Sequence, residues 1–265
     1  LKRIFNDSSP IEKWIKDPSL SQDIKNYAAM VSMVDYNVGQ VLDLLRELKL
    51  EKDTIVFFTG DNGGQDRFRS QKKPRGFFGP NVNPKTGEEF RGGKGNLFEG
   101  GLRIPYLVRW PGKIKSGQVN DLIFYQPDVL PTLADLTGAK KPKDIDGISF
   151  LPTLLNKGLQ QKHEMLYWEF RSQIAVRHNN WKAIQTKPNR AWELYDLNKD
   201  ISETTNVAEK NPDLLAKMKL FAKASHEPVI TGKYLDNKRS KHERDRRAKW
   251  GTAKQQPKVK QRKKT

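Results

Sequence analysis

The residues best suited to chemistry are Asp61 and Asn62, which follow an apolar run and precede Gly63 and Gly64. The run Thr54–Thr59 is uncharged and rich in β-branched and aromatic residues, so it predicts a strand buried on both faces of a sheet. In an open α/β sheet the reactive crevice lies beyond the carboxyl ends of the strands, where this pair would be placed. A carboxylate beside an amide oxygen suits a hard cation such as Ca²⁺ or Mg²⁺. The glycines allow a tight turn and a close backbone approach to a ligand.

A long amphipathic helix is expected to lead into this strand, over Ser21–Leu48. Its apolar residues recur at steps of three and four and form one stripe. The stripe consists of Ile24, Ala28, Val31, Val34, Val38, Val41, Leu42, Leu45 and Leu48. Ser19 with Gln22 resembles a capping box at the helix start. The turn Glu51–Asp53 then leads into the strand, so we predict a helix–strand unit of a parallel sheet.

The segment from Gln65 to Gly93 has no hydrophobic period and is rich in Gly, Pro, Asn and basic residues, which predicts a long loop. Its basic part, Arg67–Arg75, could attract an anionic polysaccharide by long-range electrostatics, or could be an exposed, solvated loop. A second buried strand is expected over Tyr106–Trp110. A short helix over Gln126–Leu136 follows, with Gly138 as its C-terminal cap.

After Phe150 the pattern changes to short aromatic-rich segments separated by turns rich in Asn and Asp. The expected strands are Met165–Phe170, Gln173–Arg177, Trp181–Ile184 and Trp192–Leu197. A helix over Asn211–Ser225 comes next. We therefore expect an α/β core over 1–150, an antiparallel sheet with one helix over 151–232, and a basic, disordered tail over 233–265.

Composition excludes several classes of protein. No segment approaches the roughly 20 apolar residues of a membrane span. The chain of 265 residues has no cysteine, which excludes disulfides, thiolate metal sites and a cysteine nucleophile within it. Of the net charge of +18, residues 233–265 contribute +11, from 14 Lys/Arg and three Asp/Glu. No aromatic stacking platform accompanies this tail, so we do not expect it to bind nucleic acid.

An ordered set of motifs resembles the arylsulfatase-type, formylglycine-dependent sulfatases. The set consists of Thr59–Gly63, Arg91–Gly95, Glu99–Pro105, Pro127–Leu133, Asp146–Pro152, Leu166–Phe170, Asn180–Lys182, Glu193–Leu197 and Glu203–Val207. It covers Tyr27 to His226 in the order of the family. The resemblance implies an alkaline-phosphatase-like α/β core, of which residues 1–150 form the C-terminal part, and a small C-terminal antiparallel α+β subdomain.

The same resemblance implies hydrolysis of the sulfate monoester of a saccharide or an aryl sulfate, by a formylglycine hydrate beside Ca²⁺. Asp61 and Asn62 match metal ligands of the family, although a simple turn after a strand uses the same residue types. The amide oxygen of Asn62 favours Ca²⁺ and a sulfatase, because related phosphatases place a histidine there and bind Zn²⁺ or Mn²⁺ through nitrogen. Mg²⁺ is the less favoured alternative to Ca²⁺. Lys94 matches the catalytic lysine that contacts the sulfate, in a loop whose glycines leave room for that group. Arg91 is assigned to substrate binding, either by direct contact or by holding a carboxylate or backbone group near the site.

Other candidate residues receive structural interpretations. Glu99 and Arg103 are expected to form a salt bridge rather than to act in catalysis. The tryptophans at 168, 181 and 192 could line a sugar site, but their strand spacing favours the core. The histidines at 163, 178, 226 and 242 match no catalytic histidine of the family.

Several parts of the family pattern are absent from the chain. The formylglycine motif, the first two aspartate ligands and the catalytic histidine would all precede Leu1, which is not a methionine. We therefore expect that an N-terminal piece is missing and that the chain alone is inactive. Two alternatives remain: a phosphate or phosphonate monoesterase of the same superfamily, and a non-catalytic module that binds anionic polymers. The family suggests a periplasmic, secreted or lysosomal location.

Overall fold

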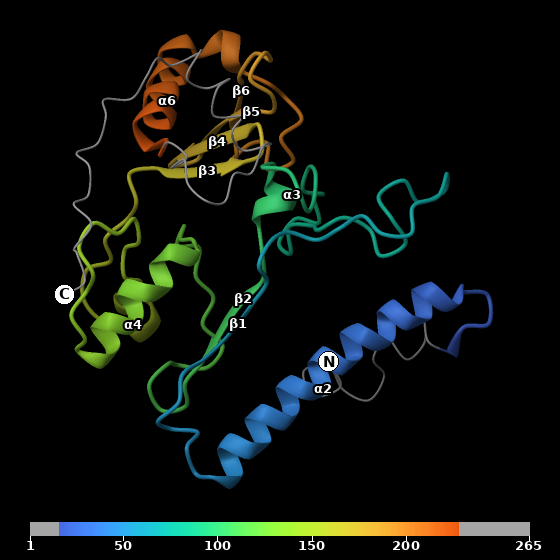
Figure 1. Ribbon diagram of the computed structural model, residues 1–265, viewed down its shortest axis with the longest axis vertical. Coiled ribbons are helices and arrows are strands. Elements are labelled where there is room, and N and C mark those ends of the chain that lie inside the picture. Colours follow the sequence, from blue (N-terminus) through green and yellow to red (C-terminus); the bar gives the residue numbers. More distant parts are fainter. Residues whose placement is uncertain (1–15, 228–265) are drawn as a thin grey trace, which may run out of the picture. The chain divides into compact units, whose positions relative to one another are not determined.

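The computed structural model describes residues 16–227, which form helices and antiparallel sheets (Figure 1). They divide into two compact units that alternate along the sequence. Unit 1 holds the described residues up to Asp61, together with Asp66–Gly79 and Ile104–His163. Unit 2 holds Asn62–Gln65, Pro80–Arg103 and the described residues from Glu164 onward. The segment 80–103, which sequence reasoning grouped with the α/β core, therefore belongs to the same unit as the C-terminal sheet. The basic tail lies outside the described residues.

In unit 1, helix α2 spans Gln22–Glu47. Its N-cap is Ser21, whose hydroxyl accepts the backbone N–H of Ile24 at 3.5 Å. The capping box expected at Ser19 is wrong by two residues, because the Ser19 hydroxyl instead donates to the carboxylate of Asp17 at 2.6 Å. None of the described helices is long and apolar enough to cross a membrane.

The single apolar stripe expected on α2 is only partly confirmed. Among its members Ala28 is buried, and four residues are half-buried: Ile24, Val38, Leu42 and Leu45. The other four are exposed: Val31, Val34, Val41 and Leu48. Apolar residues lie on more than one side of this helix, so no single face can bury all of them among the described residues.

Strand β1 (Val56–Thr59) pairs with β2 (Tyr106–Arg109), and Thr59 lies opposite Tyr106 (Figure 1). The pairing is antiparallel, so the parallel arrangement expected from sequence is wrong for the described residues. Burial on both faces is also wrong, since Phe58 is 40% exposed and Leu107 is 53% exposed. A two-stranded sheet leaves much of its surface uncovered, whatever the hydrophobicity of its residues.

The rest of unit 1 follows the expected pattern more closely. A 3₁₀ turn, η1 (Gln126–Asp128), leads into α4 (Val129–Thr137), and Gly138 caps this helix with a φ of +71°. A second short helix, α5 (Leu151–Leu155), was not predicted. The buried carboxylate of Asp128 accepts the N–H groups of Tyr125 and Ile148 and contacts the His163 ring at 2.8 Å. His163 is thus held by a buried carboxylate of unit 1, so the expectation that it is a surface or subdomain residue is wrong.

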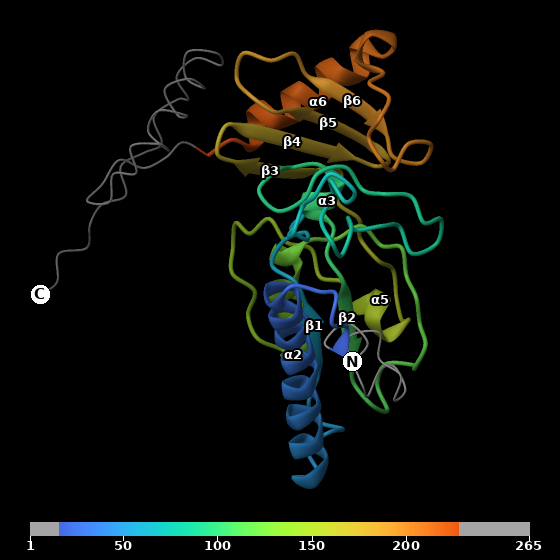
Figure 2. The ribbon, with the colours of Figure 1, turned by 90° about the vertical axis from the view of Figure 1, so that its right-hand side faces the viewer.

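Unit 2 is built on a four-stranded antiparallel sheet with strands in chain order. The strands are β3 (Leu166–Phe170), β4 (Gln173–His178), β5 (Trp181–Gln185) and β6 (Glu193–Asp196). After a 3₁₀ turn, η2 (Ala208–Lys210), helix α6 (Pro212–Ser225) lies against one face of the sheet (Figures 1 and 2). The four expected strands and the expected helix are confirmed, but residues 151–163, which were expected in this subdomain, belong to unit 1.

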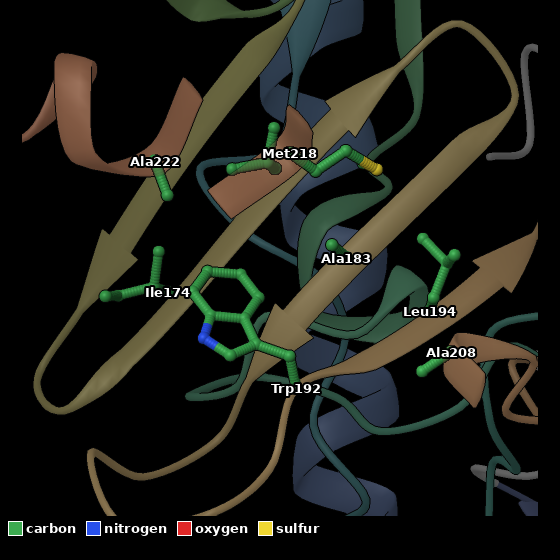
Figure 3. Close-up of a cluster of buried hydrophobic side chains, with 8 residues drawn as sticks. Ile174, Ala183, Trp192, Leu194, Ala208, Met218 and Ala222 are labelled. Atoms are coloured by element: carbon green, nitrogen blue, oxygen red, sulfur yellow. The ribbon is translucent and has the colours of Figure 1, made fainter. Parts of the chain in front are cut away.

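The two faces of this sheet bury different sets of side chains, because successive residues of a strand point to opposite faces. On the α6 face, Ile174, Val176, Ala183 and Leu194 pack with Met218 and Ala222 of the helix (Figure 3). On the other face, Ala175, Ile184 and Tyr195 pack with Leu97 and Phe98. The three predicted tryptophans lie in or against these two clusters, so their assignment to the core is confirmed.

The contribution of the α6 face can be measured with two substitutions on the same helix. Met218 is 0% exposed and Leu220 is 67% exposed. Met218→Ala should lower the free energy of unfolding by about 2–5 kcal/mol, because it removes buried contacts and leaves a cavity. Leu220→Ala should change it by less than about 0.5 kcal/mol. Urea titration followed by circular dichroism and tryptophan fluorescence measures both, and equal losses would contradict this packing.

Candidate functional site

Asp61 and Asn62 lie two and three residues beyond the end of β1, in a bend. The boundary between the two units falls between them. Asp61 is exposed and Asn62 is half-buried. Within residues 16–227, neither side chain makes a hydrogen bond or an ion pair. Their oxygens are therefore uncommitted to other described groups.

Within unit 2, backbone hydrogen bonds join the segment after Asn62 to the loop of Lys94. The N–H of Gly63 donates to the carbonyl of Gly101 at 2.9 Å, and the N–H of Lys94 donates to the carbonyl of Gly64 at 2.7 Å. The Lys94 side chain is exposed and makes no hydrogen bond or ion pair with the described part of the chain. The structure thus brings the backbones of these two predicted site segments together and leaves the ammonium available.

A four-residue helix, α3 (Glu99–Leu102), lies at the centre of this arrangement. The N–H of Gly100 donates to the carbonyl of Arg91 at 2.8 Å, which ties the helix to the start of the Lys94 loop. The carbonyl of Gly101 accepts the N–H of Gly63, which ties it to the segment after Asn62. One helical turn therefore holds both predicted site segments.

Glycine is required where these backbones meet. A Cβ atom at Gly63 would lie 1.9 Å from the carbonyl oxygen of Gly100, and one at Gly100 would lie 2.4 Å from that of Gly92. A Cβ at Gly101 would lie 2.1 Å from the carbonyl oxygen of Asn96. Real Cβ atoms do not approach backbone this closely, so any side chain would force the segments apart. Sequence reasoning related other glycines, those flanking Lys94, to room for sulfate. For Gly63, Gly100 and Gly101 the structure gives backbone contact as the reason.

The Glu99 carboxylate ties the first residue of α3 to the C-terminal sheet. It is buried and contacts the guanidinium of Arg103 at 2.5 Å, so the expected salt bridge is confirmed. It also contacts the ammonium of Lys182 at 2.8 Å and the guanidinium of Arg177 at 3.8 Å, two partners that sequence reasoning missed. Burial raises the pKa of Glu99, but the three cations outweigh burial and lower it to about 2.

Glu203 is a second buried carboxylate that sequence reasoning quoted only as part of a motif. Its Oε2 accepts the backbone N–H of Glu99 at 2.6 Å, and its Oε1 lies 2.8 Å from the Lys182 ammonium. Burial raises the pKa of Glu203 more than the nearby ammonium lowers it. The apolar residues around Lys182 in β5 give no sign of a buried charge pair, so the pairing became visible only in three dimensions.

Arg91 is held by the C-terminal sheet. Its guanidinium donates to the hydroxyl of Tyr195 at 2.7 Å and to the backbone carbonyl of Glu203 at 2.9 Å, and it contacts Glu193 at 3.3 Å. It also lies over the ring of Phe98, 3.9 Å from its centroid. These contacts commit one of its nitrogens to unit 2, and a direct contact between Arg91 and substrate stays a prediction.

The remaining candidates are placed as follows. Asp66, which precedes the basic loop, pairs with Arg69 at 3.1 Å and with Arg75 at 3.0 Å. It therefore neutralises part of the positive charge of the loop. The ring of His178 contacts the carbonyl of Glu164, and the ring of His226 contacts the carboxylate of Glu169. His242 lies outside the described residues.

The described residues contain no group of three or more His, Cys, Asp or Glu side chains that could hold a metal ion. Ca²⁺ takes six to eight oxygen ligands, and Asp61 and Asn62 offer oxygens of the right chemistry. These two residues therefore fit part of a calcium site, and further ligands would be needed to complete it.

Family comparisons agree with the motif pattern. A family model described as sulfatase matches residues 2–139. A second, described as the C-terminal part of N-sulphoglucosamine sulphohydrolase, matches residues 89–226. The chain belongs to the sulfatase family, and it corresponds to the C-terminal portion of that family.

Among curated relatives, the steryl-sulfatase of Homo sapiens is 36% identical over 172 residues, which cover 62% of this chain and 28% of the relative. The N-acetylgalactosamine-6-O-sulfatase of Bacteroides thetaiotaomicron is 30% identical over 208 residues, covering 71% of this chain and 39% of the relative. The chain thus spans about a third of the length of these proteins.

Solved structures share the fold. A Bacteroides thetaiotaomicron protein described in connection with the metabolism of multiple glycosaminoglycans matches with a TM-score of 0.62 at 27% identity, over 76% of this chain and 44% of that chain. The phosphonate monoester hydrolase of Agrobacterium radiobacter matches with a TM-score of 0.56 at 23% identity, over 76% and 41%, a likeness of fold alone. The expected α/β fold of the alkaline-phosphatase-like type is confirmed.

The glycine contacts around α3 predict a local effect of a small substitution. Gly101→Ala should lower the free energy of unfolding by about 3 kcal/mol, since the added methyl group overlaps backbone that cannot move aside. It should also speed the amide hydrogen exchange of Gly63 and Lys94. Gly112→Ala is the control: its φ is +77°, but the added group meets nothing within 4 Å, so it should cost about 1 kcal/mol. Unchanged exchange in Gly101→Ala would contradict the contact.

The low pKa of Glu99 predicts a pH dependence of stability. Its folded-state pKa of about 2 lies below the ordinary value of 4.5, so the ionised carboxylate stabilises the fold above pH 4.5 and this contribution is lost as the pH falls toward 2. Between pH 4.5 and 3, the unfolding free energy of the native chain should fall more steeply than that of Glu99→Gln. The difference should reach about 1.4 kcal/mol per pH unit. Urea titrations at several pH values measure both slopes, and parallel slopes would contradict the assignment.

Proposed function

We propose that this chain is part of a sulfuric ester hydrolase that removes sulfate from a saccharide or an aryl sulfate. Membership of the sulfatase family supports the reaction class. The observation that carries the proposal is the set of uncommitted groups on Asp61, Asn62 and Lys94, the last two on segments joined by backbone hydrogen bonds. A cation and an ammonium are the groups needed to bind the anionic end of a sulfate ester.

Asp61 and Asn62 would hold Ca²⁺ through a carboxylate and an amide oxygen, and Mg²⁺ is less favoured because it demands a more regular geometry. Bound Ca²⁺ would neutralise negative charge on the sulfate oxygens. Lys94 would bind a sulfate oxygen with its ammonium, a compact charge on a flexible stem, and would stabilise that oxygen as charge shifts during ester cleavage. Arg91 would contribute by holding the loop that carries Lys94.

The nucleophile is proposed to lie outside the 265 residues. The chain spans about a third of its relatives, and it contains neither the formylglycine motif nor the remaining metal ligands expected from the family resemblance. A formylglycine in the remaining part of the protein would supply the attacking oxygen. The chain alone is therefore proposed to be inactive.

The nature of the substrate is proposed from two features. The named relatives include a steryl-sulfatase and an N-acetylgalactosamine-6-O-sulfatase, which favours a sulfate ester of a sterol or sugar hydroxyl. The basic loop Arg67–Arg75 would favour a substrate with further negative charge, such as a sulfated saccharide. The second candidate function is a phosphonate or phosphate monoesterase, for which the fold of the phosphonate monoester hydrolase is the supporting observation. The amide of Asn62 favours the sulfatase.

Paired substrates test this proposal on the protein expressed with its natural upstream coding sequence. It should hydrolyse an aryl sulfate faster than the matching aryl phosphate, lose activity with a chelator and regain it with Ca²⁺. Lys94→Met should lower kcat/KM by about 10²–10³-fold, because it removes a charge from the sulfate oxygen. Lys113→Met, at an exposed lysine of unit 1, is the matched control and should leave kcat/KM unchanged.

Each other outcome has a distinct meaning. Faster hydrolysis of the phosphate ester would favour the monoesterase. Binding of a sulfated polymer with no turnover of either ester would favour a non-catalytic module. Turnover of the sulfate by the 265 residues alone would contradict the placement of the nucleophile elsewhere.

A further inference from the structure

Two charged side chains lie completely inside unit 2 and have no part in the proposed chemistry. They are Lys182 on β5 and Glu203 in the turn after β6, each with a side chain that is 0% exposed. The backbone of Glu203 adopts a φ of +52°, a region that a residue with a side chain rarely occupies. The turn therefore places the Glu203 side chain in the interior although its backbone conformation is unfavourable. The contacts of that side chain must offset this cost.

The position of Lys182 follows from the alternation of side chains along β5. Ala183 packs on the α6 face, and Ile184 packs on the opposite face, so Lys182 shares the face of Ile184. Its cross-strand neighbours are Arg177 on β4 and Tyr195 on β6. A row of polar side chains therefore crosses the sheet on the side where Leu97 and Phe98 pack, immediately before α3.

The Lys182 ammonium lies between two carboxylates. It is 2.8 Å from Oε1 of Glu99 and 2.8 Å from Oε1 of Glu203. The other oxygen of Glu203 accepts the backbone N–H of Glu99 at 2.6 Å. Lys182 and Glu203 thus hold the first residue of α3 twice: Lys182 binds its side chain, and Glu203 binds its backbone.

A buried ion pair is by itself weak evidence for stability, because well-packed apolar residues often serve as well or better. What such a pair provides is a defined geometry, since both charges must remain matched. The element whose geometry is defined here is α3. After Glu99, its second residue, Gly100, binds the Lys94 loop, and its third, Gly101, binds the segment after Asn62. The path from Lys182 to the site runs through Glu99 and two backbone hydrogen bonds.

We infer that Lys182 and Glu203 are positioning residues, which orient α3 and through it the backbone that carries Asn62 and Lys94. The C-terminal sheet is then a required support of the site. The structural part of this inference stands on contacts within unit 2, and only its catalytic consequence rests on the proposed function.

Amide hydrogen exchange tests the structural part in the 265-residue chain, whatever its activity. Lys182→Met should speed exchange of the amides of Gly63, Lys94 and Gly100 by at least ten-fold relative to that of Val176 in β4. Gln185→Leu is the matched control. Gln185 is buried on the same strand, and its amide donates to the carbonyls of Pro188 and Arg190, away from α3. It should leave those three amides unchanged.

A second substitution covers the case in which Lys182→Met does not fold. Glu203→Gln keeps an oxygen that can accept the N–H of Glu99 but removes the charge that faces Lys182. It should speed the same three exchange rates by a smaller factor than Lys182→Met. Lys182→Arg, which keeps the positive charge, should restore part of the protection. If folded Lys182→Met and Glu203→Gln both exchange at the native rate, the inference is overturned.

Kinetics of the protein expressed with its upstream coding sequence test the catalytic consequence. Lys182→Met should lower kcat/KM for the aryl sulfate at least ten-fold, with KM raised as the Lys94 loop loses its position. Lys182→Arg should recover part of this loss, and Gln185→Leu should leave both constants unchanged. If the unmodified protein hydrolyses no sulfate ester while Lys182→Met still speeds exchange, the proposed function fails and the positioning role stands. If it hydrolyses the ester and neither the exchange rates nor KM change, the positioning role fails alone.

Discussion

Contact between backbones without intervening side chains is the constraint on which the site region depends. Three segments meet at α3: residues 62–65, residues 91–96 and the helix itself. The hydrogen bonds that join them require the carbonyl of Gly100 to lie where a Cβ of Gly63 would be. A side chain at any of these contacts would push the segments apart by more than a hydrogen bond can stretch. Gly63 is therefore required because the backbone of Gly100 lies against it, and both motifs contain glycine where their backbones meet.

Electrostatics in a dry interior then define where α3 lies. Glu99 is buried among three cations, and Glu203 accepts its backbone N–H. Charges removed from water are costly unless each one is matched, so this cluster tolerates few alternative arrangements. The pKa values of the two carboxylates shift in opposite directions, because three cations outweigh burial at Glu99, whereas at Glu203 burial outweighs the attraction of Lys182. The sheet of unit 2 supplies two of these cations, Arg177 and Lys182.

This arrangement gives the C-terminal sheet a role beyond its own stability. Its α6 face is a conventional apolar core, whereas its other face combines Ala175 and Ile184 with polar side chains that reach α3. Arg91 adds a further link, from the Lys94 loop to Tyr195 and Glu203. Residues 80–103 and the sheet form one compact unit for this reason, although about sixty residues separate them in sequence.

The amino-acid sequence by itself determined the features that depend on local pattern. Periodicity and spacing were enough to predict strands β3 to β6 and helices α2, α4 and α6. They also predicted the core position of the tryptophans and the Glu99–Arg103 salt bridge. The ordered motifs also indicated the family, which the comparisons show. The metal-binding role of Asp61 and Asn62 stays a prediction.

Only the tertiary structure decided the features that depend on distant partners. Local pattern could not predict the direction of the β1–β2 pairing or the exposure of Phe58. It also could not predict that residues 80–103 belong to the unit of the C-terminal sheet. The buried contact of Lys182 with Glu99 joins residues 83 positions apart. Hydrophobic periodicity reports which face of an element is buried, but it carries no information about what lies across from that face. The partner of a buried charge is therefore visible only once the chain has folded.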